Sequence, residues 1–291
     1  MDILNLLTNI FICSYLENNY FSINFLYLNL IYTLFTIMYG NSLTSKILLY
    51  YLFSLSRKNL DNYLNNENNY IVGLKLLGLF NIIYTVNGTY QLFLYYNGLN
   101  YSKKLQNVKI FYKKTLNAYL VSIFNLNFIG IPYIFFLIDK CKFINYIFIA
   151  DNKNYKNLLL LFILNTFVNE ILFYYSHRLL HTKKFYKFHK MHHKFTSPNS
   201  LTALYCHPFE FLISNLIPFT FGFYITGIDL YFILLWIIGA CLGTQYHHSG
   251  FKNIFTLSFD HNPNFHDDHH RYFNYNYGNL GLLDLIHNTH L

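Results

Sequence analysis

Six apolar stretches divide the chain, and most of them are long enough to cross a membrane as helices. A spanning helix needs about 20 mostly apolar residues to cross roughly 30 Å of hydrocarbon. Five stretches meet this length with few charges: Phe21–Tyr39, Ile71–Tyr96, Asn117–Ile138, Leu158–Tyr175 and Ile228–Tyr246. We expect a sixth stretch, Pro208–Thr226, to be a re-entrant or interfacial segment. The sequence therefore predicts an all-α, multi-span integral membrane protein, with four to six spans.

Composition and charge agree with a membrane location. Charged residues make up only 12% of the chain and apolar residues 54%, whereas soluble domains carry roughly 25% charge. The net charge of +8 comes from lysines and arginines in short loops between apolar runs, such as Lys183–Lys194. This placement is typical of positive-inside topology and of contact with anionic lipid headgroups. We therefore expect membrane lipids as partners and no nucleic acid.

The four cysteines give no sign of a disulfide framework or a thiolate zinc site. Cys13, Cys141, Cys206 and Cys241 lie far apart and form no C-x-x-C pair. We expect them to be buried thiols.

Histidine is confined to the carboxyl-terminal part of the chain. All 14 histidines lie between His177 and His290, and most fall into four clusters with the spacing of metal ligands. Neutral imidazole is the commonest side-chain ligand of first-row transition metals. The predicted ligands are His177, His181, His189, His192, His193, His247, His248, His266, His269 and His270.

The spacing within the clusters suggests how they bind. His177 and His181 are four residues apart and stack on one face if the helix before them continues. The two H-x-x-H-H clusters, at residues 189–193 and 266–270, each place three imidazoles on one face of a turn. Because one ion takes at most about six ligands, this many histidines favours two ions.

Other polar residues near the clusters are candidates for orienting the ligands rather than binding metal. Carboxylates commonly hold a ligating imidazole in place, and Glu170, Asp267 and Asp268 are suitably placed in the sequence. His207, just before Pro208, is a further candidate for such a supporting role. His261, His287 and His290 are expected to be ordinary loop or tail residues.

These motifs resemble those of the fatty acid hydroxylase and sterol desaturase superfamily of membrane di-iron oxygenases. The resemblance rests on Glu170-Ile-Leu-Phe-Tyr-Tyr-Ser-His177-Arg-Leu-Leu-His181, Tyr186-Lys-Phe-His189-Lys-Met-His192-His193, Tyr205-Cys-His207-Pro208, His248-Ser249-Gly250, His266-Asp-Asp-His269-His270 and the tail around Tyr277-Gly278. It covers roughly residues 160 to 289. The tail looks most like sterol C-5 desaturases, whereas the Glu170 and His248 motifs look equally like sterol C-4 methyl oxidases.

The resemblance implies an activity, cofactors and partners. It implies an iron-dependent oxidation of a lipid by O2, with two Fe ions, and sterol C-5 desaturation is our first hypothesis. Sterol C-4 methyl oxidation and fatty acid or sphingolipid hydroxylation remain open. Electrons would come from NAD(P)H through a reductase and cytochrome b5, in the endoplasmic reticulum membrane, with the histidines on the cytosolic side.

Two readings outside this activity also remain open: a divalent-metal transporter, and a catalytically silent relative that keeps the fold.

The sequence divides into membrane helices with polar connectors over residues 1–115 and a hydroxylase-like catalytic domain over 116–291.

Overall fold

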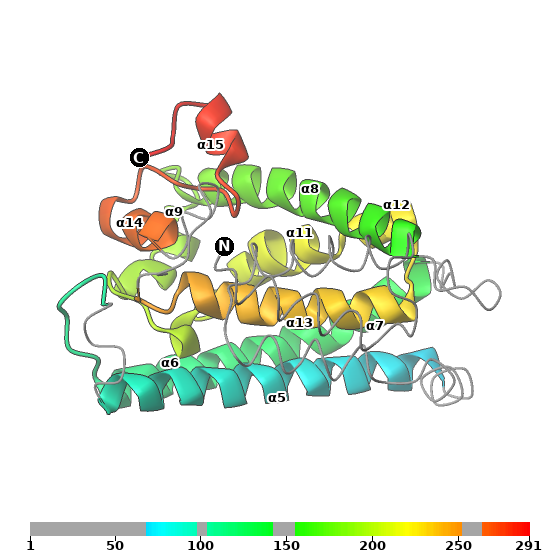
Figure 1. Cartoon of the computed structure of the whole chain (residues 1–291), viewed down its shortest axis with the longest axis horizontal. Helices are drawn as coiled ribbons and strands as arrows, with labels where there is room; N and C mark the ends of the chain where they lie inside the picture. Colours follow the sequence, from blue (N-terminus) through cyan, green and yellow to red (C-terminus); the bar gives the residue numbers. More distant parts are fainter. Residues whose placement is uncertain (1–67, 98–103, 142–154, 252–263) are drawn as a thin grey trace, which may run out of the picture.

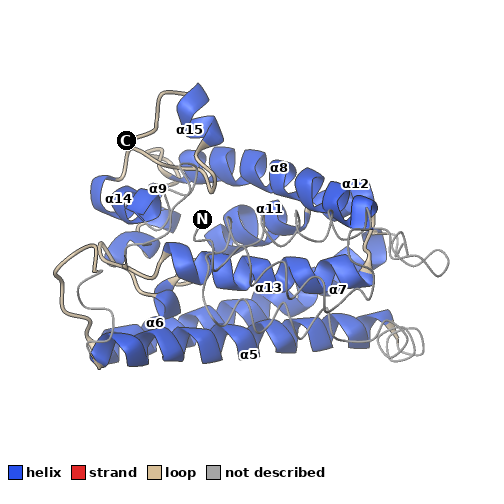
Figure 2. Cartoon of the chain, in the orientation of Figure 1, coloured by secondary structure: helices blue, strands red, loops and turns tan. Residues whose placement is uncertain are grey.

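The computed structural model describes residues 68–97, 104–141, 155–251 and 264–291. These residues form helices and loops, and the described part of the chain contains no strand (Figure 2). The predicted span at residues 21–39, together with Cys13, lies outside them. The longer helices are α5 (Asn69–Tyr96), α6 (Tyr112–Phe124), α7 (Gly130–Lys140), α8 (Tyr155–Leu180) and α13 (Leu230–His247). The prediction of an all-α fold is confirmed.

Four helical segments are long and apolar enough to cross a membrane: Asn69–Tyr96, Tyr112–Lys140, Leu159–Leu180 and Pro208–Thr226. The first three agree with the predicted spans. In the second, a single π-helical turn (η2, Asn125–Ile129) joins α6 to α7. The fourth covers the stretch that the sequence analysis expected to be re-entrant or interfacial; its length and composition also suit a span, so that expectation stays a prediction. Here α10 (Pro208–Glu210), η5 (Phe211–Leu216), α11 (Ile217–Thr220) and α12 (Gly222–Thr226) follow one another as a helical run of 19 residues.

Helix α13, which covers the span predicted at 228–246, forms the buried centre of the bundle. It has 18 residues, and most of its described side chains are buried. A helix that is apolar all round is stable only where neighbours cover every side, and α13 packs against α5 and α8. Trp236 is 1% exposed, and its ring lies between those of Phe162 and Phe219.

Buried polar contacts fix the carboxyl-terminal end of α13 against α5. The Gln245 side chain is fully buried; its amide donates to the Tyr84 carbonyl (2.6 Å) and accepts from Asn87 (2.8 Å). The Ser200 hydroxyl donates to the Gln245 carbonyl (3.0 Å). Buried hydrogen bonds of this kind define a single arrangement, because leaving any one of these groups unpaired is costly.

This packing gathers the histidine-bearing segments at one end of the bundle. In Figure 1 the carboxyl-terminal ends of α8 and α13 lie at the left, beside α9 (Tyr186–His189) and α14 (Asn264–Tyr272). Helix α15 (Leu282–Ile286) packs against α8 at the same end. The three described cysteines, Cys141, Cys206 and Cys241, are buried free thiols. Because α5 and α13 share one hydrophobic core, the division at residue 115 stays a prediction.

Candidate metal centre

Nine of the ten predicted ligands converge in two groups. Group A consists of His177, His181, His189, His193 and His269, and group B of His192, His248, His266 and His270. Within each group the ligand nitrogens lie within 4.8 Å of one another. The tenth residue, His247, belongs to neither group, although its ring centre lies 6.3 Å from that of His266.

The structure divides each H-x-x-H-H cluster between the two groups, which corrects the expectation of three imidazoles on one face. The first and last histidines of a cluster join one group, and the middle one joins the other. In α14, successive residues turn by about 100°, so His269 and His270 point about 100° apart with His266 between them. At the first cluster the chain turns after His189, the last residue of α9, and continues as a 3₁₀ turn over His192–Lys194.

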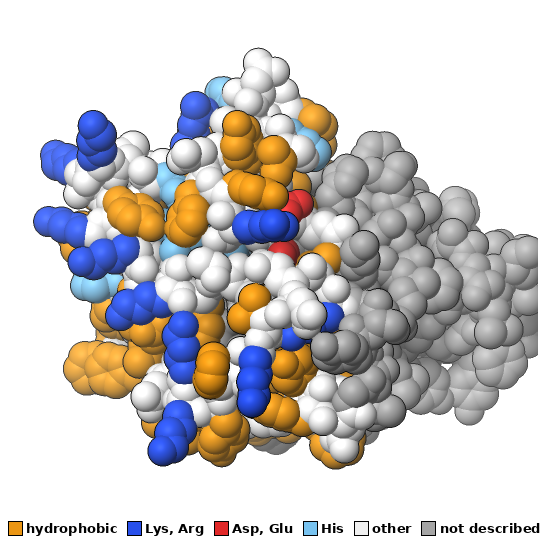
Figure 3. Space-filling view, turned by 90° about the vertical axis from the view of Figure 1, so that its left-hand side faces the viewer, with side chains coloured by type: hydrophobic (Ala, Val, Ile, Leu, Met, Phe, Trp, Pro, Cys, Tyr) orange, Lys and Arg blue, Asp and Glu red, His pale blue; other side chains and the backbone are white. Residues whose placement is uncertain are grey.

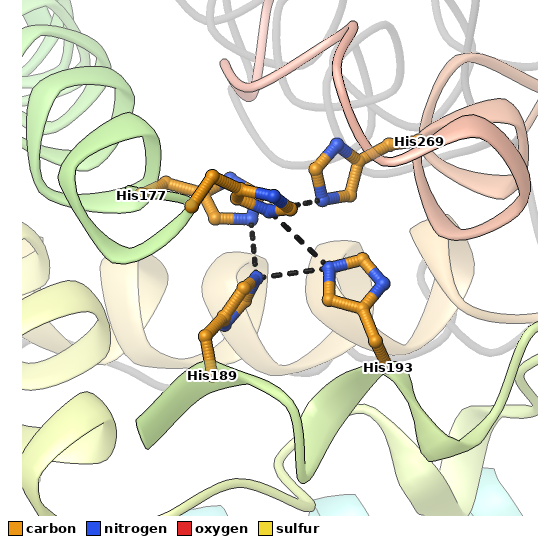
Figure 4. Close-up of side chains that lie close together, drawn as sticks. His177, His189, His193 and His269 are labelled. Carbon is orange, nitrogen blue, oxygen red and sulfur yellow. Dashed lines mark hydrogen bonds between the residues drawn. The ribbon is translucent and has the colours of Figure 1, made fainter. Parts of the chain in front are cut away.

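The distances within the groups fit metal coordination. In group A the Nε2 atom of His189 lies 2.9 Å from the Nε2 atom of His193 and 3.2 Å from the Nε2 atom of His177 (Figure 4). In group B the Nε2 atom of His266 lies 2.9 Å from that of His248 and 3.1 Å from that of His270. Two nitrogens bound about 2.1 Å from one ion lie about 3.0 Å apart at a right angle and about 3.4 Å apart at the tetrahedral angle.

The opposite ring nitrogens are held by acceptors, which fixes the tautomer. The Nδ1 atoms of His177, His269 and His248 donate to the carbonyls of Tyr277 (2.7 Å), Tyr275 (2.7 Å) and Thr244 (2.8 Å). An imidazole that donates from Nδ1 keeps a lone pair on Nε2. These lone pairs point at the group centres, as ligands require.

Burial also keeps the imidazoles in the form that binds metal. Burial, with smaller contributions from neighbouring imidazoles, lowers the pKa of His181 to about 2. Burial lowers the pKa of His192 to about 4, despite an opposing hydrogen bond to the Tyr205 carbonyl. The pKa values of His189, His248, His266, His269 and His270 also fall well below the usual value, with burial as the main cause. Neutral histidine is therefore the resting state at pH 7, and the donor set fits first-row transition metals.

The carboxyl-terminal tail supplies two of these carbonyls, and two buried carboxylates hold it. Asp284 accepts from the backbone N–H groups of Tyr277 (2.8 Å) and Gly278 (2.7 Å). Glu170 accepts from those of Asn279 and Leu280, both at 2.9 Å. The predicted orienting residue Glu170 thus acts on the tail loop rather than directly on an imidazole.

The remaining candidates for an orienting role make other contacts. Asp267 accepts a hydrogen bond from Gln106 (2.9 Å), and Asp268 is only partly buried. His207 caps α10, where its Nδ1 atom accepts from the Phe209 N–H (3.1 Å).

Among the described residues, the one carboxylate that contacts a predicted ligand was not predicted from the sequence. Glu210 is 3% exposed, and its Oε1 atom accepts from His189 Nδ1 at 2.8 Å. A signal was present, because Glu210 is the lone carboxylate of the apolar run 208–226. A carboxylate buried in such a run requires a partner.

Two neighbouring cavities lie at the histidine end of the bundle, and they share several lining residues. The smaller one is lined by histidines of both groups, including His177 and His192, together with Glu210. A second, larger cavity lies between α5, α7, α8 and α13 and is lined mainly by apolar side chains. Apolar space therefore opens beside the histidines of both groups.

Comparison with known proteins gives the family. The family model for fatty acid hydroxylase matches residues 162–289, which include every histidine of both groups. This region is a fatty acid hydroxylase domain. The relatives of the domain include fatty acid hydroxylase domain-containing protein 2 of Homo sapiens, 45% identical over 125 residues, or 43% of this chain and 36% of that protein.

Two further relatives of the hydroxylase domain carry more specific names. Fatty acid hydroxylase ahd1 of Mycosarcoma maydis is 37% identical over 123 residues (42% of this chain, 31% of that protein). Methylsterol monooxygenase 2-2 of Arabidopsis thaliana is 35% identical over 109 residues (36% and 41%). The matched region spans less than half of each of these three relatives. No solved structure matches the chain.

Proposed function

We propose that this protein is an iron-dependent enzyme that uses O2 to oxidise a C–H bond of a membrane lipid. The observation that carries the proposal is the convergence of nine imidazoles, in two groups, at the end of an apolar cavity. The ten predicted histidines are the proposed ligands, although His247 belongs to neither group and lines both cavities. All-nitrogen sites of this kind suit iron, although zinc competes for them.

The residues of this chain hold the metal ligands in place, orient their imidazole rings and shield the site from water. Bound iron would supply the activation of O2 that attack on an unactivated C–H bond requires. Carbonyls of Tyr275, Tyr277 and Thr244 keep the imidazoles in the ligating tautomer. The apolar walls exclude water and fix which part of the lipid lies beside the site.

A sterol is the first candidate substrate. The relatives named methylsterol monooxygenase support a sterol, and the tail motif supports C-5 desaturation as the specific reaction. Sterol C-4 methyl oxidation and hydroxylation of a fatty acid or sphingolipid are the alternatives. They share the histidine site and differ in which carbon the cavity presents.

Electron supply is proposed to come from NAD(P)H through a reductase and cytochrome b5, at the cytosolic face of the endoplasmic reticulum. The end of the molecule that bears the histidines is rich in Lys and Arg (Figure 3). Exposed cations there include Arg178, Lys183, Lys184, Lys187 and Arg271. A basic surface of this kind attracts an acidic donor and raises its association rate.

The transporter reading is less well supported. A transporter would place histidines and carboxylates opposite one another within its spans. Within the described residues, groups A and B contain no carboxylate, and a single one, Glu210, contacts a histidine of either group. They also lie at helix ends, beside the loops that follow α8 and α13.

Expression in a yeast strain that lacks its sterol C-5 desaturase tests the proposal. The intact chain should restore the C-5 double bond in total sterols measured by mass spectrometry, and the His192→Ala and His269→Ala variants should not. Loss of C-4 methyl groups or new hydroxylated lipids would support an alternative substrate. Absence of all three products, despite expression in membranes, would contradict the proposed oxidation.

A further inference from the structure

The connector between α5 and α6 passes over the end of the molecule that bears the histidines. Its described residues run from 104 to 111, and in Figure 1 they lie at the left, where α14 also lies. The connector is outside the fatty acid hydroxylase match, which begins at residue 162. Any contact that it makes with the histidine-bearing segments is therefore support from a part of the chain outside that domain.

Hydrogen bonds join the connector to three of these segments. The Leu105 N–H donates to the carbonyl of Gly250, in the loop that follows α13 (2.9 Å). The side-chain amide of Gln106 donates to the carbonyl of Thr196, in the loop after the first H-x-x-H-H cluster (2.7 Å). The same amide donates to the carboxylate of Asp267, inside the second cluster (2.9 Å). Gln106 thus bridges the segments that carry the two clusters.

The Asp267 carboxylate depends on this amide. Asp267 is 4% exposed, and its Oδ1 atom is buried without a hydrogen-bond partner in the described part of the chain. Its Oδ2 atom accepts from Gln106. A buried carboxylate is costly unless it is hydrogen-bonded. The carboxylate therefore favours the position of α14 in which Gln106 reaches it.

The position of α14 affects group B more than group A. Helix α14 supplies His266 and His270, two of the four members of group B, but only His269 of the five members of group A. The Nδ1 atom of His269 donates to a tail carbonyl. By contrast, the Nδ1 atom of His270 is buried and has no hydrogen-bond partner among the described residues. The direction of the His270 ring is therefore set by the helix that carries it.

We propose that Gln106 is a positioning residue for the metal site of group B. It fixes α14 through Asp267 and thereby holds His266 and His270 at ligand distance from the rest of the group. The inference goes beyond the proposed function, because it concerns how group B binds a metal ion, whatever reaction follows. It also makes the connector outside the matched domain a part of the metal centre.

The affinity of each group for Zn²⁺ tests the proposal in the full-length protein, purified in detergent. A His193→Ala background leaves group B intact, and a His192→Ala background leaves group A intact. Competition with a chromophoric chelator measures the affinity in each background. Adding Gln106→Leu should lower the Zn²⁺ affinity of group B about tenfold and leave that of group A unchanged. Binding should weaken rather than vanish, because the Asn276 amide also holds α14 through the Phe265 carbonyl (2.9 Å).

A matched control separates this effect from a general loss of stability. Asn127→Leu also removes an amide that donates twice, to the Ile123 carbonyl (2.8 Å) and to the Asn81 side chain (3.2 Å). These partners lie in α6 and α5, not in the segments that carry the histidines. This variant should leave the Zn²⁺ affinity of both groups unchanged.

Exchanging the two partners tests the hydrogen bond itself. Gln106→Glu alone brings two carboxylates together and should weaken Zn²⁺ binding by group B. Adding Asp267→Asn restores a donor opposite an acceptor and should recover part of the affinity, which two independent defects would not do.

Four results would overturn the inference. They are unchanged Zn²⁺ affinity of group B in Gln106→Leu, an equal loss from both groups, no recovery when Asp267→Asn is added to Gln106→Glu, and absence of Zn²⁺ binding by group B in the His193→Ala background. The assay uses neither O2 nor lipid, so its outcome is independent of the proposed oxidation.

Discussion

Removing the Glu210 carboxylate should weaken metal binding in group A and leave group B intact. Glu210 accepts from His189 Nδ1 at 2.8 Å, and the two side chains are 4% and 1% exposed. In a Glu210→Leu variant, the buried His189 N–H loses its acceptor. Group B has no contact with this carboxylate in the described hydrogen bonds.

The structure allows the size of the effect to be stated. A buried donor left without an acceptor costs about 1–3 kcal/mol, and 1.4 kcal/mol is about tenfold in affinity. Loss of a carboxylate behind a ligating histidine typically lowers metal affinity about 10- to 100-fold. We therefore expect a decrease of about 10- to 100-fold for Glu210→Leu and a smaller one for Glu210→Gln, which keeps a neutral acceptor.

Chelator titration of the purified protein, followed by elemental mass spectrometry, measures this decrease. One ion per chain should leave Glu210→Leu at a chelator concentration about 10- to 100-fold lower than in the intact protein, while the other ion stays. Asp268→Asn, which removes a partly exposed carboxylate next to the ligands, is the matched control and should behave like the intact protein. Retention of both ions by Glu210→Leu at intact-protein chelator concentrations would refute the reasoning.

Three further predictions concern the packing of the tail, the stability of the protein at low pH and the basic surface. An added methyl group in Gly278→Ala would lie 2.7 Å from Glu170 and 2.8 Å from Asp284. The free energy of unfolding should therefore fall by about 1–3 kcal/mol. Unchanged stability in denaturant titrations would contradict the close packing of the tail against these two carboxylates. The metal-free protein should lose stability as the pH falls below 6.5, because the folded chain keeps His192 and His193 neutral while the unfolded chain takes up protons. Chemical denaturation at pH 7 and pH 5 measures the loss of stability. Greater stability at pH 5 than at pH 7 would be inconsistent with the prediction. Reversing the charge of residues 183, 184 and 187 should slow reduction by an acidic donor most at low ionic strength, and stopped-flow rates unaffected at low salt would exclude docking at this surface.

Much of the fold could be predicted from apolar run length. The helices at residues 69–96, 112–140 and 155–180 follow the predicted spans closely, because a long apolar run in a membrane has few alternatives to a helix. Run length did not distinguish 208–226 from 228–246. The first leaves Phe221, Tyr224 and Ile225 exposed, whereas most side chains of the second are buried, and that difference depends on which neighbours cover each helix.

The sequence could predict which residues form the candidate site, but not which histidines belong to which group. The i, i+4 pairs 189/193 and 266/270 each stay in one group, as helical spacing suggests. That His192 and His269 cross to the other group depends on how two short helices face one another, which spacing alone does not encode. The orienting carbonyls of Tyr275 and Tyr277 were equally hidden, since every residue carries a carbonyl and only the fold of the tail selects these two.

Counting bound ions in paired variants tests the two-site account most directly. We expect two transition-metal ions per chain in the intact protein, purified from membranes and measured by elemental mass spectrometry. His193→Ala, in group A, and His192→Ala, in group B, should each retain one ion, and the double variant none. A single ion in the intact protein, or loss of both ions from either single variant, would contradict two separate groups.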